Sequence, residues 1–212
     1  MVIVYGGSFN PPTRAHIEIM NYLLKKFQPD QLIVVPVGDR YPKAHLAPFH
    51  HRVEMLKIAT RGMEKVLIST FEDRPVFEGT ITLLETIQRE YDATVYFVLG
   101  ADQLVTLDKW IRVEELIARF RFIVLPRDGI DVKEYIAHHP MLSRYQDHFI
   151  IADDFPPSAL SATLYRWKQD DSVVLPEINE YIYRHQLYQR GVDYDESSVC
   201  PCSGNITKTT SR

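Results

Sequence analysis

The chain has 212 residues, of which 45% are hydrophobic and 25% charged, with a formal net charge of -4. This composition excludes a collagen-like, a wholly disordered or a disulfide-scaffold protein. The slight acidity offers no basic surface to a nucleic-acid backbone, and no apolar run approaches the roughly 18–20 residues of a membrane span. We therefore expect one domain that binds neither nucleic acid nor membrane.

Two features bear on the cellular compartment. Residues 1–7 have no basic region and are typical of a first strand rather than a signal peptide. The two cysteines, Cys200 and Cys202, lie near the end of the chain, so neither a disulfide nor a cysteine-based zinc site is expected in the core. These observations favour a cytoplasmic protein.

Apolar runs and helical periodicity alternate along the chain. Six short runs are predicted to be strands: 2–5, 31–37, 65–69, 94–100, 121–126 and 148–152. Apolar stripes and capping signals predict helices over 13–27, 51–59, 80–91, 113–118, 161–169 and 177–188. This alternation predicts an α/β fold, a Rossmann-like doubly wound parallel sheet that binds ligands beyond the carboxyl ends of its strands.

We place a single α/β domain over residues 1–190 and a flexible polar tail over residues 191–212. From residue 192 on, the chain has no Leu, Phe or Trp, and it cannot bury enough apolar surface to offset its ordering entropy. Two cysteines without further ligands do not make a metal site there.

Residues 6–16, Gly-Gly-Ser-Phe-Asn-Pro-Pro-Thr-Arg-Ala-His, follow the first strand. The glycines remove Cβ atoms where the backbone must turn and approach a ligand. Thr13 is the predicted N-cap, which makes His16 the third helical residue and puts both on one side of the first turn. The imidazole then lies beside free N–H groups and the positive end of a helix dipole, which suits a polyphosphate. The alternative is a capped helix with a buried, hydrogen-bonded histidine.

A second segment has similar chemistry. Ser161 is predicted to cap a short helix, and Thr163 and Arg166 lie three residues apart on it. A hydroxyl and a guanidinium with paired donors therefore meet at one helix start, as a phosphate site requires. The alternative is a capped surface helix with a solvated arginine. Neither segment is a P-loop, because no Gly-Lys-Ser/Thr follows.

Together the two segments resemble the nucleotidyltransferases with the H/T-x-G-H signature, and more narrowly the nicotinate and nicotinamide mononucleotide adenylyltransferases. Residues 7–16 match the first family motif in its Thr-x-x-His form, with Ala15 at the glycine position. Residues 160–166, Leu-Ser-Ala-Thr-Leu-Tyr-Arg, resemble the second motif, Ile-Ser-Ser/Ala-Thr-x-x-Arg. The resemblance extends from residue 1 to about residue 190.

Segments between the two motifs resemble further family landmarks. Residues 36–43, Pro-Val-Gly-Asp-Arg-Tyr-Pro-Lys, end at Lys43, a point charge suited to phosphate. Asp102 follows the fourth strand and is suited to ribose hydroxyls, whereas Trp110 is suited to stacking on a pyridine ring. Arg127 follows the fifth strand, where the family flanks the adenine. The alternatives are a helix-capping Asp102, a core Trp110 and a loop charge at Arg127.

The resemblance implies a transfer of the adenylyl group of ATP to nicotinate or nicotinamide mononucleotide, with pyrophosphate released and no covalent enzyme intermediate. The implied catalytic residues are His16, Lys43 and Arg166. The implied ATP contacts are Gly7, Ser8, Phe9, Thr13, His16, Gly100, Asp102, Arg127, Ser161, Thr163 and Arg166. The implied mononucleotide contacts are Lys43, Thr80, Thr82 and Trp110. Mg²⁺ is expected to arrive with ATP, without protein ligands of its own.

Two alternatives to this function remain. Another adenylyl or cytidylyl transfer of the same superfamily, such as phosphopantetheine adenylylation, would leave Trp110 without a ring to stack on. A non-catalytic nucleotide sensor would not need His16, Lys43 and Arg166 together. The choice between nicotinate and nicotinamide, and the assembly into homo-oligomers, stay open.

Overall fold

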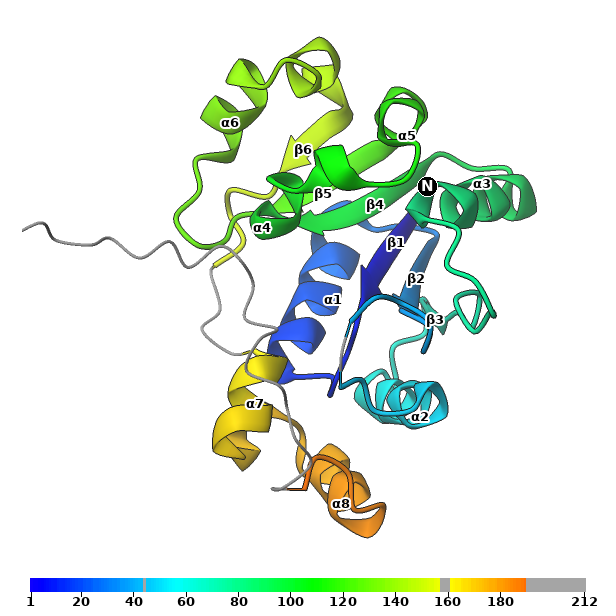
Figure 1. The fold of residues 1–212 in the computed structure, drawn as a ribbon, viewed down its shortest axis with the longest axis vertical. Coiled ribbons are helices and arrows are strands. Elements are labelled where there is room, and N and C mark those ends of the chain that lie inside the picture. Colours follow the sequence, from blue (N-terminus) through cyan, green and yellow to red (C-terminus); the bar gives the residue numbers. More distant parts are fainter. Residues whose placement is uncertain (44, 157–160, 190–212) are drawn as a thin grey trace, which may run out of the picture.

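A computed structural model describes residues 1–43, 45–156 and 161–189 of the chain. One parallel sheet runs through the molecule in the strand order β3-β2-β1-β4-β5-β6 (Figure 1). The strands are β1 (Val2–Gly7), β2 (Gln31–Pro36), β3 (Val66–Ile68), β4 (Val95–Gly100), β5 (Arg121–Leu125) and β6 (Phe149–Ile151). The order reverses between β1 and β4, so the predicted doubly wound α/β sheet is confirmed, with its ligand crevice expected at that reversal.

Helices and short 3₁₀ turns connect the strands. The helices are α1 (Arg14–Phe27), α2 (Phe49–Ala59), α3 (Thr80–Tyr91), α4 (Ala101–Leu104), α5 (Val113–Arg119), α6 (Val132–His138), α7 (Ala162–Lys168) and α8 (Pro176–Arg184). The 3₁₀ turns are η1 (Leu107–Lys109), η2 (Leu142–His148) and η3 (Asp171–Val173).

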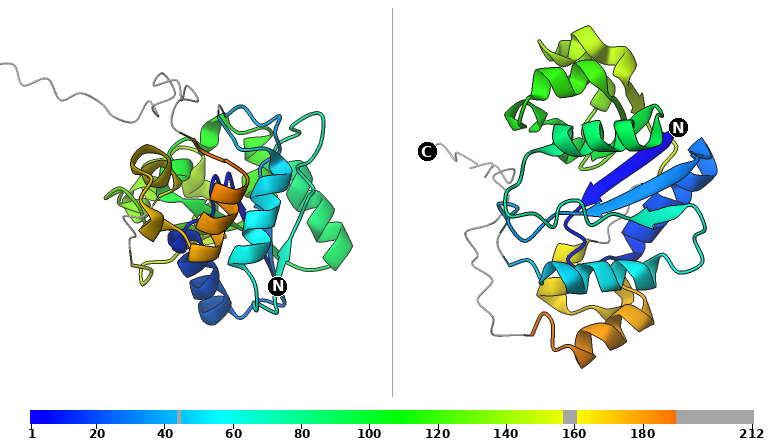
Figure 2. Two further views of the ribbon diagram at one scale, coloured as in Figure 1. Left: turned by 90° about the horizontal axis from the view of Figure 1, so that it is seen from below. Right: turned by 90° about the vertical axis from the view of Figure 1, so that its right-hand side faces the viewer.

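The side chains of β1 alternate between two apolar layers. Val2 and Val4 belong to a core cluster that includes Leu84 of α3 and residues of α5. Ile3 packs in a separate cluster with Met20 of α1. The sheet therefore lies between two helical layers, as the right-hand view of Figure 2 shows. Both faces of its central strands are buried, which explains their near-continuous apolar sequences.

The last two helices form a third, smaller core against α2. Tyr165 of α7 and Ile178 of α8 pack with Met55 of α2, and all three are almost fully buried. Figure 1 shows α7 and α8 together beside α1 and α2, far from α6. This packing returns the end of the described chain to the helix that follows the second strand.

Two predictions from sequence are wrong in detail. The helix predicted over 177–188 ends at Arg184, because Gln186 and Tyr188 adopt left-handed backbone conformations with φ of 52° and 58°. The strand β3 is at the edge of the sheet, and Leu67 in it is 45% exposed rather than buried on both faces.

Two short helices were not predicted from the sequence. The α4 helix has only four residues, too few for an apolar period to stand out, and α6 has seven. In the described part of the chain, no helix has the length and apolar character needed to cross a bilayer. The tail predicted for residues 191–212 lies outside the described residues.

Candidate active site

The loop between β1 and α1 forms a tight turn at the carboxyl edge of the sheet. Phe9 is fully buried and has a φ of 45°, an uncommon conformation for a bulky residue, which the surrounding packing holds in place. Its ring meets Tyr5 edge-on, and a Cβ atom at Gly7 would lie only 3.1 Å from that ring. A larger residue at Gly7 would therefore press on the ring of Phe9, and Phe9 has only its backbone left to offer a ligand.

His16 is oriented by the residue that caps its own helix. Its Nδ1 accepts the backbone N–H of Thr13 at 2.8 Å, and the buried Thr13 hydroxyl lies 2.8 Å from the same nitrogen. Because Nδ1 is the acceptor, the proton of the neutral ring is on Nε2. The predicted N-cap and third helical position are both confirmed. The hydroxyl of Thr13 thus serves to position the imidazole.

The environment of His16 favours its neutral form. Burial, together with the positive charges of Arg127 and Lys43, lowers the pKa of His16 to about 4. The ring is half-buried, so its outer edge can still be reached. At neutral pH this side chain is therefore an uncharged hydrogen-bond donor surrounded by cations.

Arg166 connects the second helix start to the first. Its Nη1 donates to the backbone oxygen of Asn10 at 2.5 Å, and its Nη2 donates to the hydroxyl of Thr163 at 3.3 Å. Ser161 caps α7 by accepting the N–H of Leu164 at 3.1 Å. Two motifs about 150 residues apart in the chain thus meet at one place, as their chemistry predicts.

Asn10 joins two further segments and was not selected from the sequence. Its side chain is 1% exposed, donates to the carbonyl of His45 at 3.0 Å and accepts the N–H of Ala47 at 2.9 Å. Its Oδ1 also accepts the hydroxyl of Tyr188 at 2.8 Å. A buried amide with this many partners holds the turn rigidly. The position of Asn10 inside the first motif was the sequence signal that could have identified it.

Arg52 is a second buried polar residue that supports the same loops. Its guanidinium is fully buried and donates to the carbonyls of Ala47, Ser8 and Val37 at 2.7, 3.2 and 2.6 Å. It also forms an ion pair with Asp39 at 3.0 Å. Burial lowers the pKa of Arg52, and Asp39 opposes that effect. Arg52 therefore fixes the end of β1 relative to the end of β2.

Lys43 and Ser8 lie on the two loops that Arg52 connects. The ammonium group of Lys43 donates to the hydroxyl of Ser8 at 3.2 Å. Its positive charge also lowers the pKa of His16, so the two side chains are close enough to interact. The structure thus places Ser8, His16 and Lys43 around one stretch of loop.

The ends of β4 and β5 form the next part of this edge. A Cβ atom at Gly100 would lie 2.3 Å from Oδ1 of Asp102, so a larger residue there would displace that carboxylate. That oxygen is buried without a hydrogen-bond partner in the structure. The other oxygen of Asp102 lies 3.9 Å from Arg127, which is half exposed. An unpaired buried carboxylate oxygen is the kind of group that a ligand hydroxyl can satisfy.

Three of the four predicted mononucleotide contacts, Thr80, Thr82 and Trp110, lie around the start of α3, whereas Lys43 lies beside Ser8. Thr80 is the first residue of α3, and Thr82 donates its hydroxyl to the carbonyl of Glu78 at 3.1 Å. Trp110 meets Phe97 edge-on, with ring centroids 6.0 Å apart. Phe97 in turn leaves no room for a Cβ atom at Gly6, where it would lie 3.0 Å from the ring. Two half-sites therefore flank the carboxyl ends of β1 and β4.

Comparison with known proteins identifies the class and then the family. Residues 4–168 match the model of the cytidylyltransferase-like family, so the chain is a nucleotidyltransferase of that family. It is 33% identical over 193 residues to "Probable nicotinate-nucleotide adenylyltransferase" of Acholeplasma laidlawii, covering 89% of this chain and 98% of that relative. A protein of the same name from Caldicellulosiruptor bescii is 34% identical over 199 residues, covering 89% and 99%. The chain belongs to the nicotinate-nucleotide adenylyltransferase family.

A solved structure has the same fold. The Plasmodium falciparum nicotinic acid mononucleotide adenylyltransferase complexed with NaAD matches with a TM-score of 0.73 and 22% identity. The match covers 88% of this chain and 96% of the other. At that identity the likeness establishes the Rossmann-like single-domain fold.

Proposed function

We propose that this enzyme transfers the adenylyl group of ATP to nicotinate mononucleotide. The 5′-phosphate oxygen of the mononucleotide attacks the α-phosphorus of ATP in line, the bond from that phosphorus to the bridging oxygen breaks, and pyrophosphate leaves. Such a reaction needs positioning and charge neutralisation rather than a protein nucleophile. The observation that carries the proposal is the contact between Arg166 and the backbone of Asn10, which brings together the two helix starts proposed to bind phosphate.

His16, Lys43 and Arg166 are the proposed catalytic residues. The low pKa of His16 keeps its ring neutral, and Nδ1 accepts the N–H of Thr13, so the ring proton is on Nε2, from which it can be donated to a non-bridging phosphate oxygen. Lys43 and Arg166 supply the positive charges that stabilise negative charge developing on the leaving pyrophosphate. Arg166 adds a planar fork that can bind two oxygens at once.

The remaining ATP contacts follow the sheet edge. The backbone around Ser8 and Phe9 and the helix start at Ser161 are proposed to frame the phosphates. The unpaired Oδ1 of Asp102 is proposed to accept a ribose hydroxyl, and Arg127 to flank the adenine.

Mg²⁺ is proposed to enter with the triphosphate. Among residues 1–43, 45–156 and 161–189, no three His, Cys, Asp or Glu side chains are grouped to hold a metal ion. A cation held by phosphate oxygens and water needs no such group, since Mg²⁺ commonly binds substrate phosphates and keeps several waters. When bound, it would neutralise part of the charge on the β- and γ-phosphates.

The start of α3 supports nicotinate over nicotinamide. Gly79 precedes this 12-residue helix with a φ of 86°, and no side chain caps the helix. The N–H of Thr82 donates to the carbonyl of Gly79 at 3.2 Å, so the N–H groups of Thr80 and Ile81 are the ones at this helix start that a ligand can bind. The positive end of the helix dipole favours a carboxylate over a neutral amide. Thr80, Thr82 and Trp110 are proposed to surround the pyridine ring.

A pyrophosphate-release assay tests the proposed function. The enzyme is supplied with Mg²⁺, ATP and one acceptor at a time: nicotinate mononucleotide, nicotinamide mononucleotide or phosphopantetheine. We expect the highest kcat/KM with nicotinate mononucleotide. A preference for phosphopantetheine would assign a different transfer, and binding of ATP without release from any acceptor would support the sensor. The cytoplasmic location and the lack of nucleic-acid and membrane partners stay predictions.

A further inference from the structure

Three consecutive residues, 110–112, hold the segment between η1 and α5 against β4 and α3. Trp110 contacts Phe97 of β4. Ile111 packs on the backbone of Gly79, so closely that a Cβ atom at Gly79 would lie 2.8 Å from the Cβ of Ile111. Arg112 reaches Glu85, more than one turn into α3. The residue proposed to stack on the pyridine ring is therefore held beside the helix start proposed to bind its carboxylate.

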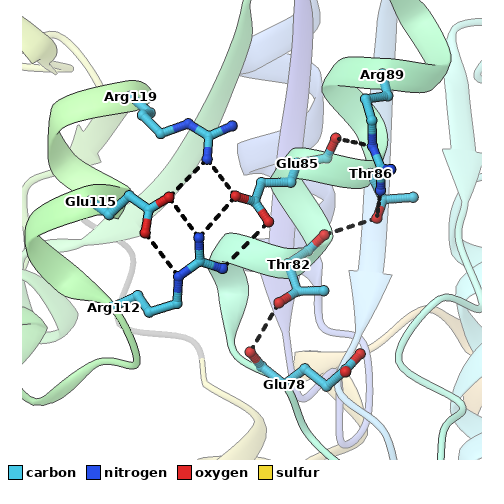
Figure 3. A network of polar contacts seen from close by, with 8 residues as sticks. All are labelled: Glu78, Thr82, Glu85, Thr86, Arg89, Arg112, Glu115 and Arg119. Carbon is cyan, nitrogen blue, oxygen red and sulfur yellow. Dashed lines mark hydrogen bonds and ion pairs between the residues drawn. The ribbon is translucent and has the colours of Figure 1, made fainter.

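A closed ring of four charges forms the outer fastening, which we call the α3–α5 clamp (Figure 3). It consists of Glu85 on α3 and Arg112, Glu115 and Arg119 at or within α5. Arg112 donates to Glu85 at 3.1 and 3.4 Å and to Glu115 at 2.6 and 2.9 Å. Arg119 donates to both carboxylates as well. Each carboxylate thus bridges both guanidinium groups, and the ring has no net charge.

The backbone at Arg112 shows that this geometry is imposed. Arg112 is the N-cap of α5 and has a φ of 53° and a ψ of 42°, the left-handed region that favours glycine. An arginine in that conformation persists when its surroundings hold it there. Its fork bonds to two carboxylates are contacts that can hold it there.

We propose that the α3–α5 clamp positions Trp110 for the mononucleotide, and that Glu85 and Arg112 are positioning residues for that substrate. This inference rests on the proposed function. The clamp acts on one substrate because Trp110 and the start of α3 belong to the mononucleotide half-site, whereas His16, Lys43 and Arg166 are held by other contacts. A ring displaced by about 1 Å loses much of its stacking and aligns the attacking phosphate poorly.

The positioning of Trp110 is testable without any substrate. The chain has two tryptophans, and Trp167 is 68% exposed on α7, so Trp167→Phe leaves Trp110 as the single indole reporter. In that background we expect Glu85→Gln and Arg112→Gly to raise the acrylamide quenching constant of Trp110 about twofold, because its segment is released. Arg112→Gly removes the fork and supplies the residue that suits the backbone there.

Steady-state kinetics then locate the effect on one substrate. We expect both variants to raise KM for nicotinate mononucleotide about 5- to 10-fold, with KM for ATP changed less than about twofold. If the clamp acts as a unit, Glu85→Gln combined with Arg112→Gly will cost no more than either variant alone. Glu180→Gln, which breaks an exposed ion pair with Arg184 on α8, is the matched control and should change neither constant.

The outcomes separate the inference from the proposed function. Unchanged Trp110 quenching in folded variants, or equal changes in both KM values, would overturn the positioning role while leaving the adenylyl transfer intact. If the unsubstituted enzyme fails to use nicotinate mononucleotide, the proposed function fails, and quenching still reports whether the clamp positions Trp110. Circular dichroism confirms that each variant is folded.

Discussion

The two half-sites are held by different kinds of contact. In the ATP half, buried polar side chains bond to loop carbonyls: Asn10 is 1% exposed and Arg52 fully buried. In the mononucleotide half, the outer fastening is a ring of ion pairs whose arginines are more than 40% exposed. Buried, fully bonded networks are rigid, whereas exposed ion pairs are weak and screened by salt. The comparison therefore predicts that the ATP half-site is rigid, whereas the mononucleotide half-site is less rigid and depends on salt concentration.

The largest expected effect is on catalysis in the ATP half. Asn at position 16 can still accept the N–H of Thr13 through its Oδ1 but lacks the outer donor that Nε2 provides. We expect His16→Asn to lower kcat by at least about 100-fold, as expected for losing one preorganised donor. Pyrophosphate release measures the rate, and circular dichroism checks the fold. A kcat within a factor of two of the original would remove His16 from catalysis.

Replacing Arg52 tests the rigidity of the ATP half. Lysine keeps the charge but cannot reach three carbonyls and a carboxylate with one ammonium group. We expect Arg52→Lys to lower the free energy of unfolding by about 2–3 kcal/mol, since buried acceptors lose their donors. Urea unfolding measures this value. A loss below about 0.5 kcal/mol, the range of ordinary surface substitutions, would contradict the role.

The depressed pKa of His16 predicts an acid-dependent loss of stability. Its folded pKa of about 4 lies below the unfolded value of 6.5, so the unfolded chain binds more protons between these values. Stability from this residue is complete above pH 6.5 and falls as pH drops toward 4. At pH 5.5 the loss relative to His16→Asn should be about 1.4 kcal/mol. Parallel pH profiles of urea midpoints for both proteins would contradict this.

A smaller effect is expected where the chain returns to the first loop. Tyr188→Phe removes the hydroxyl that Asn10 accepts at 2.8 Å and leaves the ring packed against Tyr165. The free energy of unfolding should fall by about 1 kcal/mol, the value of one net hydrogen bond. Thermal unfolding measures the change. Asn10→Ala should lower the free energy of unfolding by more, because it leaves several buried groups without a hydrogen-bond partner. An equal or smaller loss would contradict the central role of Asn10 in this network.

The smallest effect comes from salt and separates the two halves directly. Raising potassium chloride from 0.1 to 0.5 M shortens the Debye length from about 10 Å to less than half of that. The clamp should weaken, so Trp110 in the Trp167→Phe protein should become more accessible to acrylamide. With the clamp already broken by Glu85→Gln, the same salt step should change quenching less. Equal responses in the two proteins would mean that the ion pairs do not hold the segment.

Several parts of the molecule were predictable from the sequence because their signals are local. Thr13 and His16 lie within one turn, and Arg166 and Thr163 within another, so spacing predicts their contacts. Supporting residues were not predictable, because their partners are distant and often backbone atoms. Tyr188 and Asn10 are separated by 178 positions. A backbone carbonyl, such as those that Arg52 holds, has no signature in the sequence at all.

The most direct test of the account is a crystal structure of the enzyme with Mg²⁺ and a non-hydrolysable ATP analogue. The account predicts that Nε2 of His16 and the guanidinium of Arg166 both lie within hydrogen-bonding distance of the same triphosphate, at the carboxyl ends of β1 and β4. A triphosphate bound elsewhere, or contacted by only one of these two side chains, would contradict it.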